Sequence, residues 1–209
     1  MACSTVLLLD YLSCALLGGS AAFRGGRHSL PFMGALILGV ACALSSPLLR
    51  SIMLFITTQI VPQADAFNGR GYLAASFAGA CAGYLLQGRM PEEAPAFPVL
   101  EGASLALATV LGTHTALAIG APPVGSVVIG CIAGTVGGML RDLCLNERPA
   151  LLETDFYGSA VVVGAMAVTG LHALHADLRL QMAAGGVCVF GLRLLGTWRM
   201  KRLGKFSEF

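Results

Sequence analysis

The sequence predicts an all-α membrane protein with seven transmembrane helices, arranged as two inverted three-helix repeats plus a C-terminal helix (3+3+1). Three observations predict this fold. The chain is 56% apolar and only 11% charged, its apolar runs lack strand-like alternation, and its first half aligns on its second half at a constant shift. Soluble domains average about 25% charged residues, so this chain has too few to cover a water-facing surface.

Seven apolar segments are each long enough to cross a hydrocarbon core of ~30 Å, which takes about 20 helical residues. Gly, Pro and charged residues separate them, as is typical of loops. We interpret the first segment as a retained helix rather than a signal peptide, because no positive region precedes it and Asp10 interrupts it. The seven helices are expected near residues 4–22, 31–54, 71–88, 97–118, 124–146, 156–174 and 180–198.

The Lys and Arg residues predict one orientation in the membrane. Basic residues gather in cytoplasmic loops, and the C-terminal tail holds Arg199, Lys201, Arg202 and Lys205. We therefore expect a multi-pass protein of the cell inner membrane, with the C-terminus cytoplasmic and the N-terminus outside. The cytoplasmic loops would then also carry Arg24, Arg27, Arg89 and Arg148, whereas the outer loops would carry Arg70 and Arg179.

Several classes of function are excluded by what the sequence lacks. The seven cysteines lie mostly in apolar runs without a CxxC or metal-like spacing, so we interpret them as packing residues. No metal and no cofactor is expected. A basic patch interleaved with aromatic residues is missing, which argues against nucleic acid as a partner. No catalytic triad, paired catalytic carboxylates or phosphate-binding loop is present, so an enzyme is not expected.

An internal repeat appears when the sequence is shifted by 91 residues. Matched positions include Pro31 with Pro122, Gly39 with Gly130, Arg50 with Arg141, and Asp10 with Glu101. The repeat unit contains three helices, and an odd number means that the two units enter the membrane from opposite sides. The predicted divisions are residues 1–90 and 91–178 for the two repeats, and 179–209 for the seventh helix and basic tail.

The second and fifth helices carry residues that disturb a helix at the same repeat position. Pro47 cannot donate to the carbonyl of Ala43, and Gly137 with Gly138 weakens the equivalent turn. Carbonyls freed at membrane depth must face protein or water. These carbonyls, together with the hydroxyls of Ser45, Ser46 and Thr135, predict a cation path between the two interrupted helices. The alternative is two kinks that only let helices pack closely.

Charges inside a span need partners, since each costs ~2.5–3.5 kcal/mol on the insertion scale. The repeat predicts two symmetry-related ion pairs, Asp10–Arg50 and Glu101–Arg141, unless all four groups reach headgroup water. Asp142 has Ser51 as its repeat partner and therefore no symmetric neutralisation. If it faces the path, it leaves one half net negative, which favours cations. Alternatively, Asp142 is a second partner for Arg141 or for a loop arginine such as Arg148.

Small residues recur four apart in three of the predicted helices. Such rows let helices approach closely in lipid, either within one chain or between subunits, and the sequence leaves both uses open. The rows are Ala35, Gly39 and Ala43; Ala75, Gly79 and Gly83; and Gly130, Gly134 and Gly138.

The stretch from Gly134 to Asp142, followed by Arg148-Pro149 and Tyr157, resembles the prokaryotic relatives of the trimeric intracellular cation channels. The pattern of that family is a glycine triplet, two apolar residues and Arg-Asp in each repeat. Here the first copy reads Ser45-Ser46-Pro47 and Arg50-Ser51. The resemblance implies a homotrimer in which each protomer holds a potassium-permeable pore lined by the second and fifth helices. By position, the pore residues would be Ser45, Ser46, Pro47, Arg50, Ser51, Val136, Gly137, Gly138, Arg141 and Asp142.

The expected function is therefore a passive monovalent-cation channel, with permeant potassium, membrane lipids and two further copies of the chain as its partners. A secondary transporter of a small solute such as glycine is the alternative, since inverted repeats with broken helices also describe transporters. A structural or assembly protein of the membrane is the third reading.

Overall fold

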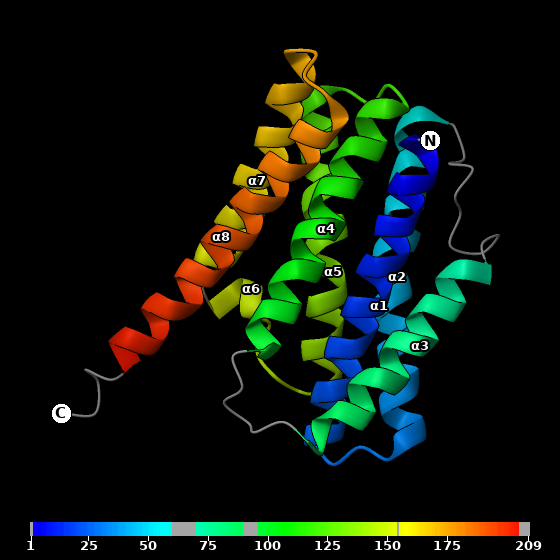
Figure 1. The fold of residues 1–209 in the computed structure, drawn as a ribbon, viewed down its shortest axis with the longest axis vertical. Helices are drawn as coiled ribbons and strands as arrows, with labels where there is room; N and C mark the ends of the chain where they lie inside the picture. Colours follow the sequence, from blue (N-terminus) through cyan, green and yellow to red (C-terminus); the bar gives the residue numbers. More distant parts are fainter. Residues whose placement is uncertain (1, 60–69, 90–95, 154, 205–209) are drawn as a thin grey trace.

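Eight helices and no strand make up the part of the chain that the computed structural model describes, which is residues 2–59, 70–89, 96–153 and 155–204. Seven long helices lie at the seven predicted positions (Figure 1). The predicted basic residue Lys205 lies outside the described residues. The helices are α1 (Ala2–Arg27), α2 (Phe32–Thr58), α3 (Arg70–Gln87), α4 (Ala96–Ala118), α5 (Pro123–Cys144), α6 (Ala150–Glu153), α7 (Asp155–Ala173) and α8 (Leu178–Gly204).

Four of the described helices are long and apolar enough to cross a membrane, and α7 provides a shorter apolar helix over Tyr157–Ala173. The four spans are Thr5–Arg27, Phe32–Thr58, Pro123–Cys144 and Leu178–Arg199. The molecule also turns many large apolar side chains outward, among them Ile37 at 66% exposure and Val187 at 71%. An apolar outer surface of this kind is what a lipid environment requires. The chain is an all-helical membrane protein.

The structure differs from the predicted helices at the end of the first helix and in one additional short helix. The first helix continues five residues beyond the predicted end at residue 22, to Arg27. Its last turn carries Arg24 and Arg27, and cations stabilise the negative end of a helix. The guanidinium of Arg27 also lies over the ring of Phe23, 5.4 Å from its centroid. The short helix α6 was not predicted, because its start depends on a carboxylate from α5 described below.

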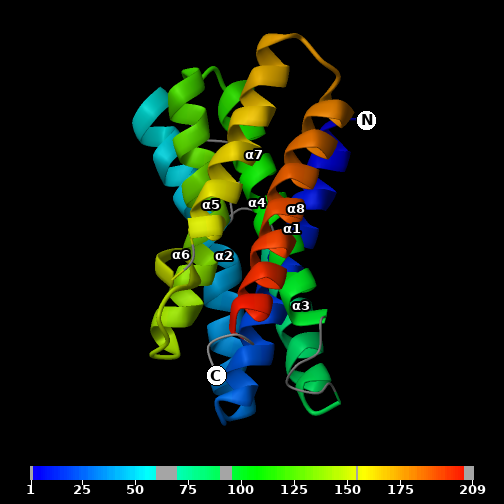
Figure 2. The same ribbon diagram turned by 90° about the vertical axis from the view of Figure 1, so that its left-hand side faces the viewer.

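The helices form one bundle in which α2 and α5 lie against each other. α1 packs most extensively on α3 and also contacts α2, whereas α5 packs on α4 and α7. α8 covers α4 and α7 from outside (Figures 1 and 2). Besides the α2–α5 contact, α1 packs on α4. The division of the chain into residues 1–90, 91–178 and 179–209 stays a prediction.

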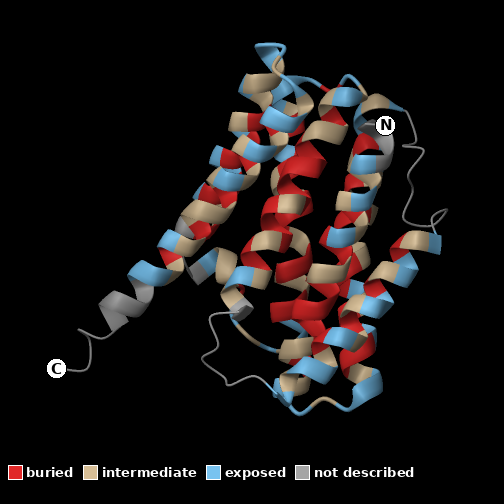
Figure 3. Cartoon of the chain, viewed as in Figure 1, coloured by how far each residue is buried: buried red, intermediate tan, exposed pale blue. Residues whose placement is uncertain are grey.

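The rows of small residues are used for packing within the chain. A side chain at Gly79 would overlap the backbone carbonyl of Ala15, and one at Gly83 would overlap that of Gly19. A Cβ at Gly39 would lie 2.8 Å from the carbonyl oxygen of Gly18, again on α1. Buried residues gather where the helices face one another in the middle of the bundle (Figure 3).

Gly83→Val is expected to destabilise the protein by at least ~1–3 kcal/mol, the usual cost of overpacking, because the collision is with backbone that cannot rotate away. Thermal unfolding in detergent, followed by fluorescence or circular dichroism, measures this loss. Gly170→Val is the matched control, since nothing lies within 4 Å of a Cβ at that position on α7. Equal melting temperatures for the two variants would contradict the α1–α3 contact described here.

Candidate ion pathway

A buried ion pair joins α1 to α2 near the end of the bundle where α1 begins, called the upper end here (Figure 1). Arg50 donates from both terminal nitrogens to the two carboxylate oxygens of Asp10, with Nη1 and Oδ1 3.1 Å apart. The hydroxyl of Tyr72 on α3 donates to Asp10 Oδ2 at 2.6 Å. A two-pronged guanidinium–carboxylate contact is the strong form of this interaction. We call these three side chains the upper cluster.

A larger cluster lies at the opposite end, the lower end, where α1 and α5 end. Arg141 is fully buried and its Nη2 lies 2.7 Å from Glu101 Oε1 and 2.7 Å from Asp142 Oδ1. Arg193 of α8 lies 3.3 Å from the other carboxylate oxygen of Glu101. Its guanidinium also stacks over the ring of Tyr157, 4.6 Å from the centroid. Arg141, Glu101, Asp142, Arg193 and Tyr157 form the lower cluster. Both predicted ion pairs are therefore present.

Asp142 does not carry an unbalanced charge. Its Oδ1 accepts from Arg141 Nε at 2.8 Å, and its Oδ2 accepts from the backbone N–H of Ala150 at 3.1 Å. Because Ala150 is the first residue of α6, the carboxylate of Asp142 caps this helix. The described lower cluster thus contains two guanidinium groups and two carboxylates, and its net charge is zero. The condition under which Asp142 would leave this half net negative is therefore not met among these described groups. The alternative, in which Asp142 is a second partner for Arg141, is what the structure contains.

Between the two clusters, α2 and α5 touch along a line that we call the seam. The hydroxyl of Ser46 donates to the carbonyl of Ala133 across it. One turn lower, Leu17 of α1 fills the space beside Gly137: a Cβ there would overlap the leucine side chain and lie 2.9 Å from the carbonyl oxygen of Cys42. The middle of the seam is therefore closed by direct contact between three helices.

Neither helix ends at the predicted interruptions, since α2 is helical through Pro47 and α5 is helical through Gly137 and Gly138. The kinks expected at these positions stay a prediction. The carbonyl of Ala43, which the proline nitrogen cannot serve, accepts instead from the thiol of Cys14 on α1 at 3.6 Å. A neighbouring helix thus satisfies the freed acceptor, which is how membrane helices tolerate proline.

The remaining predicted site residues differ in how closely they approach the seam. Ser45 and Thr135 donate to carbonyls of their own helices, Cys42 at 2.7 Å and Cys131 at 2.8 Å, so their hydroxyls are engaged locally. Ser51 has a buried hydroxyl without a partner among the described residues. Val136 is half-buried on α5. A Cβ at Gly138 would lie 2.9 Å from the hydroxyl oxygen of Tyr157, so this glycine makes room for the tyrosine.

Sequence reasoning missed two groups. Arg193 lies in the seventh predicted span, and the rule that a charge within a span needs a partner would have singled it out. The second group is at the lower edge, where Arg24 pairs with Glu147 and lies 3.7 Å from Asp142 Oδ1. His28 Nε2 contacts the other oxygen of Glu147 at 2.7 Å. These half-exposed contacts tie the end of α1 to the loop that follows α5, and no local pattern indicates them.

The fold and these clusters define the class: an all-helical membrane protein in which two buried carboxylate–arginine clusters flank the contact between two central helices. Comparison with known proteins agrees. The chain is 28% identical to a UPF0126 membrane protein of Deinococcus radiodurans over 197 residues, 93% of this chain and 89% of that protein. It is 26% identical to the UPF0126 inner membrane protein YadS of Escherichia coli over 200 residues, 94% of each.

Solved structures carry the comparison further. The trimeric intracellular cation (TRIC) channel orthologue from Rhodobacter sphaeroides superposes with a TM-score of 0.83 at 27% identity, over 93% of this chain and 98% of that one. A second prokaryotic TRIC channel has a TM-score of 0.82 at 21% identity and shows the shared fold, over 92% and 95% of the two chains. A family model described as "Glycine transporter" matches residues 98–173. The resemblance to the prokaryotic TRIC channels is confirmed.

Proposed function

We propose that the chain is a monovalent-cation channel, permeable to potassium, with a path along the seam inside each protomer. The placement of two buried, self-neutralising clusters at opposite ends of one helix–helix contact carries this proposal. Ionisable residues within spans are costly and typically mark ion pathways. Similarity to a TRIC cation channel at 27% identity supports the same reading.

The proposed path is lined by the residues that the sequence indicated. From α2 and α5 these are Ser45, Ser46, Pro47, Arg50, Ser51, Thr135, Val136, Gly137, Gly138, Arg141 and Asp142, with Asp10 and Glu101 as partners of the arginines. Backbone carbonyls along the seam would replace part of the hydration shell of the ion. Because Ser46 and Leu17 close the seam in this conformation, conduction requires that α2 and α5 separate there.

A bilayer recording tests the channel. Purified protein in a planar bilayer under a potassium chloride gradient is expected to pass current that reverses between zero and the potassium equilibrium potential, because a path through two neutral clusters prefers cations without excluding anions completely. A reversal near the chloride potential, or no current from protein shown to have inserted, would overturn the proposal.

Leu17→Ala is expected to increase the unitary current or the open probability severalfold, because it removes the apolar side chain that fills the seam beside Gly137. Single-channel recording measures this directly. Val168→Ala is the matched control: it truncates an equally buried apolar side chain that packs against Gly185 of α8, away from the seam. If both variants behave like the unmodified protein, Leu17 does not restrict the path.

A secondary transporter of a small solute such as glycine is the second candidate, favoured by the family match over residues 98–173. That region contains Glu101 and Arg141, and paired opposite charges are the chemistry that would hold the ammonium and carboxylate of a zwitterion. Saturable uptake of labelled glycine into proteoliposomes that pass no potassium current would establish this function instead.

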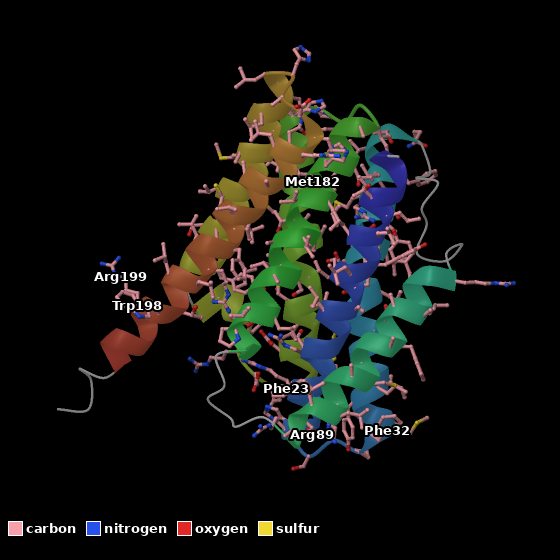
Figure 4. The ribbon with its side chains drawn as sticks, in the orientation of Figure 1. Phe23, Phe32, Arg89, Met182, Trp198 and Arg199 are labelled. Atoms are coloured by element: carbon pink, nitrogen blue, oxygen red, sulfur yellow. The ribbon has the colours of Figure 1, made fainter. Side chains whose placement is uncertain are left out.

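Assembly and orientation belong to the same proposal: a homotrimer in the cell inner membrane, with the C-terminus cytoplasmic and the N-terminus outside. The relative YadS is named an inner membrane protein, and a TRIC orthologue is named trimeric. Phe23, Phe32 and Arg89 all lie toward the lower end (Figure 4), the end proposed to face the cytoplasm. Native mass spectrometry tests the trimer, and reporter fusions to the C-terminus test the orientation.

A further inference from the structure

The lower cluster contains one charge that comes from outside both predicted repeats. Arg193 lies on α8, is 7% exposed and contacts the carboxylate oxygen of Glu101 that Arg141 does not contact. Its planar guanidinium lies over the ring of Tyr157, 4.6 Å from the centroid. Burial, an ion pair and ring stacking together fix this side chain in one position.

Comparison of the two clusters shows what the additional arginine does. The upper cluster has one carboxylate and one guanidinium, Asp10 and Arg50, and the position after the arginine is the uncharged Ser51. The lower cluster has one more acid, Asp142, at the position after its arginine. It also has one more base, Arg193. Both clusters therefore sum to zero, but the lower one reaches zero only with the charge from α8.

Among the described residues, Arg24 is the cation outside the lower cluster that lies within 4 Å of its carboxylates, and it does not substitute for Arg193. Arg24 lies 3.7 Å from Asp142 but makes its close contact with Glu147, and both of these side chains are about one-third exposed. That pair neutralises itself at the water-facing edge, where ions in solution screen it. Glu101 and Asp142 are at most 6% exposed, so an unbalanced charge between them would be screened far less.

We propose that Arg193 is a selectivity-determining residue, which holds the lower cluster at zero net charge by balancing Asp142. This inference rests on the proposed channel function. In a neutral cluster, the preference for cations comes from the carbonyl dipoles along the seam. Without Arg193 the lower end would carry one buried negative charge, which would concentrate cations and repel anions at that end of the path.

The reversal potential under a potassium chloride gradient is the decisive measurement, because it does not depend on how many channels insert or fold. Arg193→Gln is expected to move it toward the potassium equilibrium potential, and Asp142→Asn toward the chloride potential. The double variant is expected to return to the unmodified value, since it is again neutral. Asparagine retains an oxygen that can accept from Ala150, so the cap of α6 is preserved.

Two further variants separate charge from packing. Arg193→Lys is expected to rescue the original reversal potential, whereas the exposed Arg179→Gln, at the other end of α8, controls for surface charge. If Arg193→Gln fails to fold while the double variant folds, the charge balance is supported. A conducting Arg193→Gln channel with an unshifted potential would overturn the proposal, as would a double variant that fails to fold. No current from the unmodified protein would instead reject the channel function itself.

Discussion

Arg141→Met is expected to destabilise the protein by about 3–5 kcal/mol, the usual effect of removing one partner from a buried ion pair. The guanidinium is fully buried and is the shared partner of Glu101 and Asp142, so its loss leaves Glu101 with Arg193 alone and Asp142 without its closest cation, although both carboxylates are at most 6% exposed. An uncompensated carboxylate of this kind is costly, because a buried charge is poorly screened in a medium of low dielectric constant. We expect little folded protein to survive purification.

Thermal or denaturant unfolding in detergent checks this expectation. Arg89→Met is the control, because it removes an arginine from the exposed turn after α3. The further variant Arg141→Met with Glu101→Gln should recover part of the stability, since it leaves one carboxylate rather than two. An Arg141→Met protein that melts with the control would mean that the lower cluster contributes little to folding.

Removing the whole upper cluster is expected to abolish cation flow while leaving the protein folded. Asp10→Leu or Arg50→Met alone leaves one buried charge and should cost about 3–5 kcal/mol. The triple variant Asp10→Leu, Arg50→Met, Tyr72→Phe leaves none and also removes the hydroxyl that donates to Asp10. Apolar replacement of a buried ion pair is often neutral or stabilising, so the triple variant should fold.

Cation flow through the folded triple variant is nevertheless expected to fall to background, because an apolar upper end gives an ion no polar group to exchange for water. The checks are the melting temperature in detergent and a potassium flux assay in liposomes, both applied to the same preparation. A triple variant that folds and still conducts would remove the upper cluster from the path. The single variants are the controls for stability, because each leaves one buried charge and must therefore melt at a lower temperature than the triple variant.

The two ion pairs that lie within the repeats could be predicted from the sequence. Asp10 with Arg50 and Glu101 with Arg141 are each 40 positions apart, and the same spacing in both halves indicated that they meet. The seven long helices were equally accessible, because about 20 apolar residues in sequence suffice to cross a membrane. The rows of small residues predicted that helices pack closely, but only the structure shows which helices do so. The row on α3 packs on α1, the row on α2 packs on α1 and α3, and the row on α5 packs on α4.

The sequence by itself determined the membrane setting, the long helices and the partners of Arg50 and Arg141, because these follow from the cost of moving polar groups into lipid. Only the tertiary structure decided that Arg193 joins Glu101, that Asp142 is neutralised, and that α2 and α5 run unbroken with Leu17 against Gly137. The physical reason is that a buried charge or a freed carbonyl needs a polar partner, and the local sequence shows which groups have this need. Which helix supplies the partner depends on how the helices pack.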